Sequence, residues 1–195
     1  MNRTIILIIL IALSLITCEE RKKTEEKSIF PSPQVSSPYQ RRTLVKILGG
    51  GSFVPPRGFG AVTVPQTGVV DYYRKWTGNG CVAFYVRRID RGKEGSFWYA
   101  GYEIESEFDF SFAADRYFEK KSRGTAVSTP RRIKIGDREC QGFEATREIE
   151  DVEYTELLAF RIDGDALFVF RYLAPSSDYY EFWDEICASL ESFRP

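Results

Sequence analysis

The stretch YTELLAFRIDGDALFVFRYLAP (residues 154–175) carries the strongest fold signal in this 195-residue chain. Two segments rich in β-branched and aromatic residues flank the turn residues Asp163, Gly164 and Asp165. Such segments favour strands, and aspartate and glycine accept the backbone conformations of tight turns. The stretch therefore predicts a β-hairpin.

Two further pairs of apolar segments flank glycine-containing turns. They are VVDYYRKW (69–76) with CVAFYVRRI (81–89), and RRIKI (131–135) with ECQGFEATREI (139–149). The first pair encloses TGNG (77–80), where either Gly78-Asn79 or Asn79-Gly80 can form the turn centre. Residues 97–105 are expected to add another strand. Three successive hairpins predict an antiparallel sheet.

Two helices are expected beside the sheet. One covers residues 111–122, with Ser111 as its N-cap and Gly124 as its stop. The other covers residues 177–193, capped by Ser177 or Asp178. Its apolar residues recur at helical spacing and form one stripe: Phe182, Ile186, Leu190 and Phe193. The sequence thus predicts an α+β fold, an antiparallel sheet covered by helices.

The C-terminal half resembles a known family. RRIKIGDRECQGFEA, followed by LLAFRIDGDALFVFRYLAPSSDYYEFWDEICASLESFRP, looks like the closing half of the Mog1/PsbP-like fold. The resemblance covers residues 131–195, whereas the N-terminal half has only a loose counterpart in VPPRGFGAVTVP (54–65). It implies a sandwich of sheet and helices with a non-enzymatic accessory, binding or assembly role. Bacterial lipoproteins are common among the members.

The N-terminus carries a short apolar run that ends close to a cysteine. Residues 5–16 are apolar except for Ser14, which is the length of a signal-peptide core and too short to span a bilayer. Leu15-Ile16-Thr17-Cys18 resembles the lipobox of bacterial lipoproteins, in which the cysteine is acylated. An ordinary signal peptide with a chance cysteine is the alternative. In Gram-negative lipoproteins an aspartate directly after this cysteine signals retention in the inner membrane. This chain has Glu19 at that position, so the resemblance points to the outer membrane.

These features divide the chain into three parts. Residues 1–17 are expected to be a lipoprotein signal peptide, and residues 18–48, rich in charge, Pro and Ser, a flexible tether. Residues 49–195 are expected to form a single domain. The expected location is the bacterial cell envelope, where acylated Cys18 holds the protein to a membrane. The outer membrane is the expected one.

Composition argues against several function classes. The chain has no histidine, which excludes catalytic histidine bases and histidine-containing zinc sites. A formal net charge of −1 argues against a nucleic-acid partner. No metal, cofactor or catalytic residue is expected. Three cysteines remain besides Cys18, and their pairing is left open by the sequence: Cys81, Cys140 and Cys187.

Acidic residues cluster around the tip of one predicted hairpin. They are Glu148, Glu150, Asp151, Glu153 and Glu156. Alternation along strands sends several of them to opposite faces, so a solvated hairpin is favoured over a Ca²⁺ site. The expected function is therefore non-catalytic binding of a protein partner. The alternatives are a carrier of an apolar small ligand and, less favoured, a hydrolase that uses a carboxylate pair.

The first hairpin can be sorted into two faces from cross-strand parity alone. One face collects apolar residues and is expected to face the core: Tyr73, Thr77, Val82, Phe84 and Val86. The other interleaves aromatic rings with guanidinium groups, residue types enriched at interface hot spots. Its predicted partner-binding residues are Tyr72, Arg74, Trp76, Tyr85 and Arg87, and the competing possibility is that another element covers this face.

The lipobox resemblance generates a prediction about processing. We expect residues 1–17 to be removed and Cys18 to carry acyl chains in the mature protein. Mass spectrometry of the mature N-terminus in the producing bacterium measures this. An unmodified Cys18, or cleavage at another position, contradicts it.

Overall fold

The computed structural model describes residues 44–47, 49–62, 70–121 and 129–195, with only the backbone described at 70 and 71. All of these residues belong to one compact unit, residues 34–195. The predicted signal peptide, Cys18, Gly124 and most of the predicted tether lie outside the described residues. No helix in the described part of the chain is long and apolar enough to span a membrane.

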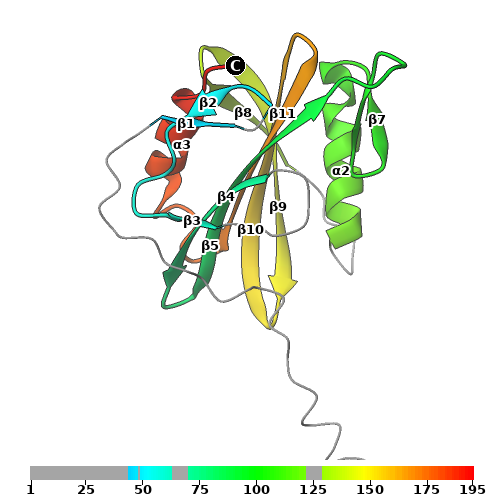
Figure 1. Ribbon diagram of the computed structural model, residues 1–195. Coiled ribbons are helices and arrows are strands. Elements are labelled where there is room, and N and C mark those ends of the chain that lie inside the picture. Colours follow the sequence, from blue (N-terminus) through cyan, green and yellow to red (C-terminus); the bar gives the residue numbers. More distant parts are fainter. Residues whose placement is uncertain (1–43, 48, 63–69, 122–128) are drawn as a thin grey trace, which may run out of the picture. The chain divides into compact units, whose positions relative to one another are not determined.

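A seven-stranded antiparallel sheet forms the centre of the unit (Figure 1). From edge to edge, its strands are β3 (Gly60–Val62), β4 (Val70–Thr77), β5 (Gly80–Asp90), β11 (Ala166–Pro175), β10 (Val152–Asp163), β9 (Arg138–Ile149) and β8 (Thr129–Ile135). Together with two helices, this sheet confirms the α+β class. The N-terminal strands meet the C-terminal meander where β5 pairs with β11.

All three predicted hairpins form. Asp163 pairs with Ala166 across the β10–β11 turn, Ile135 with Arg138 across β8–β9, and Thr77 with Gly80 across β4–β5. In the β4–β5 turn the positive φ falls on Gly80, at 145°, rather than on Gly78 or Asn79. A Cβ at Gly80 would collide with the hydroxyl of Tyr154, so glycine is required there.

Residues 97–105 do not add a strand to the main sheet, which corrects that expectation. They form a separate hairpin of β6 (Phe97–Tyr99) and β7 (Tyr102–Ile104). The hairpin packs with helix α2 (Phe110–Lys121) against one face of the sheet. Phe97, Tyr99 and Ile104 bury their side chains in the cluster that α2 covers, so the hairpin lies over the sheet face and does not extend the sheet.

Helix α2 matches the predicted helix within one residue at its start, but its cap differs. A 3₁₀ turn, η1 (Glu107–Asp109), precedes it with Ser106 as the N-cap of that turn, and Ser111 lies within α2. The Asp109 carboxylate accepts hydrogen bonds from the backbone N–H groups of Glu105 and Ser106, both at 3.0 Å. This satisfies donors that the start of a helix leaves free.

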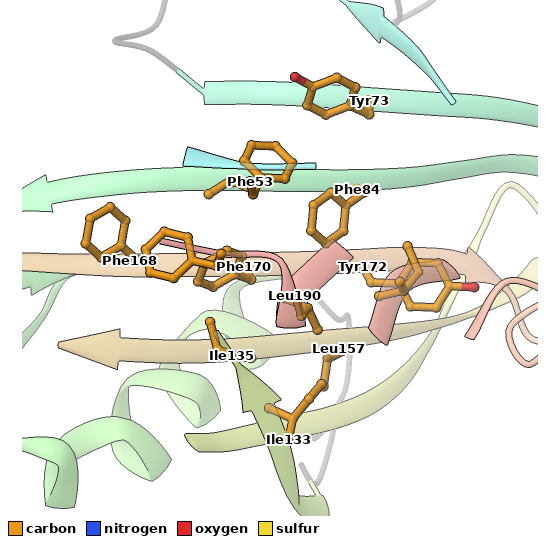
Figure 2. Close-up of a cluster of buried hydrophobic side chains, with 14 of the residues drawn as sticks. Phe53, Tyr73, Phe84, Ile133, Ile135, Leu157, Phe168, Phe170, Tyr172 and Leu190 are labelled. Carbon is orange, nitrogen blue, oxygen red and sulfur yellow. The ribbon is translucent and has the colours of Figure 1, made fainter. Parts of the chain in front are cut away.

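Helix α3 (Trp183–Glu191) covers the other face and is shorter than the predicted 177–193. Residues 176–182 form turns, because Asp178 bonds to the β4–β5 hairpin and the Tyr179 carbonyl accepts a 2.7 Å hydrogen bond from the Tyr172 hydroxyl. The predicted stripe is nevertheless buried at all four positions. Figure 2 shows part of this core, where Leu190 meets residues of several strands.

The folded part begins before residue 49. Strand β1 (Val45–Lys46) pairs with β2 (Ser52–Phe53), and Ile47 is buried in the core under α3. Residues 45–47, placed in the tether by composition, therefore belong to the domain. Ser52 also exchanges backbone hydrogen bonds with Arg194, of 2.7 and 2.8 Å, which joins the start of the domain to its end.

The buried stripe of α3 predicts the effect of a charge within it. Ile186 is fully buried, so Ile186→Asp should lower the free energy of unfolding by more than about 3 kcal/mol, because the carboxylate gains no partner. Urea denaturation followed by circular dichroism measures this. Ala188→Asp, at an exposed position of the same helix, should change stability by less than about 1 kcal/mol. Equal stability of the two variants would show that the stripe is not buried.

Candidate functional site

The register of β4 and β5 confirms the predicted sorting of the first hairpin. Tyr73 pairs with Phe84, and both belong to the core under α3. On the opposite face Tyr72 pairs with Tyr85, Arg74 with Ala83, and Trp76 with Cys81. The five predicted partner-binding residues thus share the face of the sheet that α2 partly covers. We call this surface the tyrosine–arginine face; Glu156, Arg147 and Arg171 also lie on it.

Burial separates those five residues into two groups. Trp76 is 55% exposed, Arg87 is exposed and Tyr85 is half-buried. Tyr72 and Arg74 are only 8% and 5% exposed. The expectation that Tyr72 and Arg74 lie open to a partner is therefore corrected, whereas Trp76 and Arg87 are accessible.

Tyr72 is buried because it packs within the sheet face. Its ring stacks on that of Tyr85, with 4.3 Å between centroids and 4° between planes. It also joins a small apolar cluster with Ala83, Tyr154 and Leu173. Burial raises the pKa of both Tyr72 and Tyr85, so their hydroxyls stay protonated at neutral pH.

Trp76 lies near the end of the β4–β5 hairpin, which is fixed by hydrogen bonds to Asp178. Its indole lies over Arg74, with 5.6 Å from the guanidinium carbon to the ring centroid. The next residue, Thr77, donates a 2.6 Å hydrogen bond to Asp178, and the Asn79 side chain donates to the same carboxylate. The hydrogen bond from Thr77, followed by that from Asn79, holds the pKa of Asp178 below its ordinary value. A rigid hairpin therefore presents an exposed tryptophan.

Sequence reasoning missed the charged network at the centre of the tyrosine–arginine face. Glu156 is fully buried and does not belong to the solvated acidic cluster in which it was placed. It accepts hydrogen bonds from Tyr117 at 2.7 Å and from Arg171 at 2.6 and 2.9 Å, and it pairs with Arg147 at 3.1 Å. Parity along β10 contained the signal, since Glu156 alternates in phase with the buried Leu158 and Phe160.

Arg171 is the cation at the middle of this network. Its guanidinium lies 4.6 Å from the centre of the Tyr85 ring and 4.9 Å from that of Tyr117. Burial, the largest single effect, would lower the pKa of Arg171, but the charge of Glu156 and the nearby tyrosines Tyr117, Tyr99 and Tyr85 together outweigh it and raise that pKa. Burial and then the charge of Glu156 raise the pKa of Tyr117. The network thus attaches α2 to the sheet through one carboxylate and two arginines.

The other predicted acidic residues lie elsewhere. Glu148, Glu150, Asp151 and Glu153 are all exposed around the β9–β10 turn. Among the residues that the structure describes, no group of three or more His, Cys, Asp or Glu side chains could hold a metal ion. The carboxylates around the turn are therefore individual solvated groups.

The three described cysteines are free thiols. Cys81 is buried, and Cys140 and Cys187 are half-buried. Burial raises the pKa of all three thiols, to about 11 for Cys140. They are therefore protonated and weakly nucleophilic at neutral pH.

A second group of exposed aromatic residues lies around α2 and was also missed. Phe108 is 88% exposed, Phe112 58% and Trp98 57%. Phe112 stacks against Tyr102 of β7, with 6.0 Å between ring centroids. The helical spacing contained part of this signal, because Phe112 falls outside the buried positions of α2.

Comparison with known proteins identifies relatives in structure alone. No protein-family model matches the chain, and no curated protein matches it significantly. A Pseudomonas aeruginosa protein of unknown function, described as a candidate regulator, has a similar fold: TM-score 0.51, 11% identity, 78% of this chain and 96% of that one. This likeness supports the fold.

Two other solved structures are more distant. A Bacteroides thetaiotaomicron protein matches with TM-score 0.44 and 13% identity over 74% of this chain, which spans 44% of that protein. LpqN of Mycobacterium tuberculosis, described as involved in cell envelope biogenesis, matches with TM-score 0.37 and 11% identity. That match covers 77% of this chain and 82% of LpqN.

The charged network predicts that removing the buried carboxylate of Glu156 lowers stability far more than removing an exposed carboxylate of the same strand. Glu156→Ala leaves Arg147 and Arg171 near each other without their counter-ion, and should lower the free energy of unfolding by about 3 kcal/mol. Chemical denaturation measures this. Glu153→Ala, at an exposed position of the same strand, should stay within about 0.5 kcal/mol of the parent. A Glu156→Ala variant as stable as Glu153→Ala would mean that the network contributes nothing to stability.

Proposed function

We propose that this chain is a lipid-anchored protein of the bacterial cell envelope that binds a protein partner and catalyses no reaction. The anchor is Cys18, on the strength of the short apolar run and the lipobox-like residues before it. The residue after the cysteine, Glu19, favours the outer membrane as its location. The segment up to residue 44 would then link the anchor to the folded domain.

The exposed Trp76 is the observation that carries the binding role. Trp, Tyr and Arg are the residues most enriched at interface hot spots. Trp76 is 55% exposed, and the Arg74 guanidinium packs against its ring in a cation–π contact. The hydrogen bonds to Asp178 fix the hairpin before any partner arrives, so little ordering entropy is lost on binding.

The resemblance of residues 131–195 to the Mog1/PsbP-like fold supports the same role. The observed α+β sheet with a helix on each face is the architecture that this resemblance implies. Members of that family act mainly as accessory, binding or assembly proteins. Fold alone does not establish function, so the assignment rests on the surface.

A non-catalytic reading fits the chemistry of the buried groups. The chain has no histidine to act as a base. Glu156, the fully buried carboxylate of the tyrosine–arginine face, is committed to Arg147, Arg171 and Tyr117. An acid–base catalyst needs a carboxylate that can exchange protons with a substrate, and these contacts oppose that use.

The binding proposal predicts the behaviour of two matched tryptophan variants. Trp76→Ala should weaken capture of the partner by about 2 kcal/mol or more, roughly 30-fold, with a change in stability below about 1 kcal/mol. The measurement is quantitative mass spectrometry of proteins that the full chain captures from envelope extract, with melting temperatures recorded in parallel. Trp98→Ala is the control, because Trp98 is equally exposed but lies on β6.

Two outcomes contradict the proposal. If the same proteins are captured equally by the parent and by both variants, Trp76 is not part of a binding surface. If Trp76→Ala lowers the melting temperature strongly, the side chain has a structural role and its exposure has no functional meaning.

A further inference from the structure

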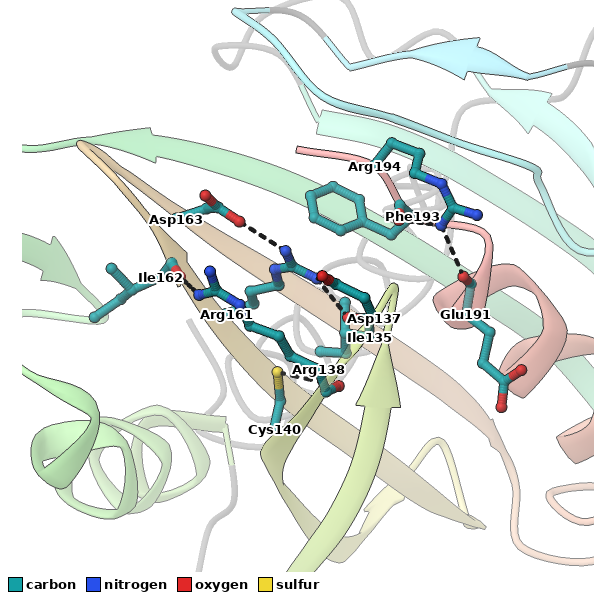
Figure 3. Close-up of polar contacts among 10 residues, drawn as sticks. All are labelled: Ile135, Asp137, Arg138, Cys140, Arg161, Ile162, Asp163, Glu191, Phe193 and Arg194. Carbon is teal, nitrogen blue, oxygen red and sulfur yellow. Dashed lines mark hydrogen bonds and ion pairs between the residues drawn. The ribbon is translucent and has the colours of Figure 1, made fainter.

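A pocket of about 600 Å³ lies at one end of the sheet, beside the β8–β9 turn and the residues that follow α3. Figure 3 shows the polar contacts of several residues that line it, among them Arg161 and Asp137. This volume is typical of small-molecule sites. Most of its lining is charged. Three cationic side chains, Lys134, Arg161 and Arg194, and two carboxylates, Asp137 and Glu191, contribute to it. The lining therefore suits a charged ligand and not an apolar one.

Arg161 is the buried element of this pocket, with 2% of the side chain exposed. One terminal nitrogen, Nη1, donates to the Ile135 carbonyl at 2.6 Å and to Asp137 at 2.9 Å. The other, Nη2, donates to Asp163 at 2.7 Å, and the guanidinium lies 5.2 Å from the centre of the Phe193 ring. Its Nε is buried without a hydrogen-bond partner. A buried guanidinium held in this way is a pre-organised carboxylate receptor.

The two carboxylates on Arg161 differ in how firmly they are held. The side chain of Asp163 is 26% exposed, whereas that of Asp137 is 79% exposed and lines the pocket. The hydrogen bond from Arg161 holds the pKa of the Asp137 carboxyl below its ordinary value. Because the Asp137 side chain is open to solvent and Asp163 also pairs with Arg161, another carboxylate can replace Asp137 while the guanidinium keeps a counter-ion throughout.

The turn that carries Asp137 reaches Arg161 only because residue 136 is glycine. Gly136 has a φ of 62°, and a Cβ there would lie 2.7 Å from Nη1 of Arg161 and 2.6 Å from the Phe193 carbonyl oxygen. Any side chain would push the guanidinium away or fill this wall of the pocket. Glycine therefore keeps Nη1 within reach of a ligand.

Two further cations face the pocket without a carboxylate of their own. Lys134 is exposed and makes no ion pair with any residue that the structure describes. Arg194 donates to the carbonyl oxygens of Glu191 at 3.2 Å and Phe193 at 2.8 Å, which leaves its charge uncompensated by a carboxylate within the described residues. Both charges favour an anion beside Arg161.

We propose that this pocket binds a small molecule bearing a carboxylate group, which takes the place of Asp137 on Nη1 of Arg161 and lies between Lys134 and Arg194. Asp137 acts as an internal competitor that occupies the receptor in the absence of the ligand. The site is separate from Trp76, so it stands or falls independently of the proposed partner binding.

Citrate is the probe for a direct test on the full chain in neutral detergent. The titration is done at constant ionic strength and followed by NMR. The backbone amide chemical shifts of Gly136, Arg161 and Arg194 should change and reach saturation. Asp137→Ala should bind citrate about three- to tenfold more tightly, because the competitor is gone, and Lys134→Ala should bind it more weakly by a similar factor. Inorganic phosphate should bind more weakly than citrate.

The matched control is Arg132→Ala, because Arg132 is an exposed cation on the same strand that does not line the pocket. It should leave citrate binding unchanged. Asp137→Asn, which keeps a hydrogen-bond acceptor and removes the charge, replaces Asp137→Ala if the latter is poorly folded, and should also bind more tightly.

The proposal is overturned by any of three results. They are no saturable shift up to about 10 mM citrate, unchanged or weaker binding in a folded Asp137 variant, and equal losses in Lys134→Ala and Arg132→Ala, which would indicate attraction to surface charge alone. Phosphate binding as tight as citrate binding would overturn the assignment of the ligand as a carboxylate.

Discussion

The pairing of β5 with β11 is the constraint on which the rest of the domain depends. It joins the hairpin near the start of the domain to the last strand of the meander, in register from Leu173 opposite Ala83 to Ala166 opposite Asp90. Without it the chain would hold two smaller sheets, one of β3, β4 and β5 and the other of β8 to β11. The contact is remote in sequence, so it forms at a considerable entropic cost and only in the presence of both halves.

That pairing also gives the two faces of the sheet their different chemistry. On the side of α3 it aligns apolar residues of β5, β11 and β10 into a continuous core. On the side of α2 it places Tyr85 opposite Arg171, whose guanidinium then reaches Glu156 on the neighbouring strand. Burying a carboxylate and two arginines is costly unless they satisfy one another, which favours a single position for Tyr117 and for the helix that carries it.

The exposed Trp76 and the pocket around Arg161 lie at opposite ends of the central strands. Trp76 lies beside the β4–β5 turn where β5 starts, whereas Arg161 lies near the β10–β11 turn, opposite the end of β5. Each is held by contacts from α3 or from the segment next to it: Asp178 precedes the helix and fixes the hairpin, and Phe193 and Arg194 follow it and line the pocket. The last helix therefore connects both surfaces to the same core.

The sequence by itself determined the local structure of this domain. Turn residues between apolar segments located three hairpins, parity sorted Tyr72, Arg74 and Trp76 onto one face, and helical spacing identified the buried stripe of α3. These features depend on interactions between residues close in the chain, or on the strict twofold repeat of a strand. Composition likewise indicated that the chain lacks histidine chemistry.

Only the tertiary structure decided which polar residues are buried and which are open. Glu156 is acidic and lies in a charged stretch, yet it is fully buried because Arg147, Arg171 and Tyr117 reach it from three other elements. Tyr72 and Arg74 are covered while Trp76 beside them is exposed, and residues 176–182 leave the helical conformation to bond with the first hairpin. The pocket around Arg161 joins β8, β10 and the residues after α3. Such outcomes depend on partners that are distant in sequence, whose approach no local pattern encodes.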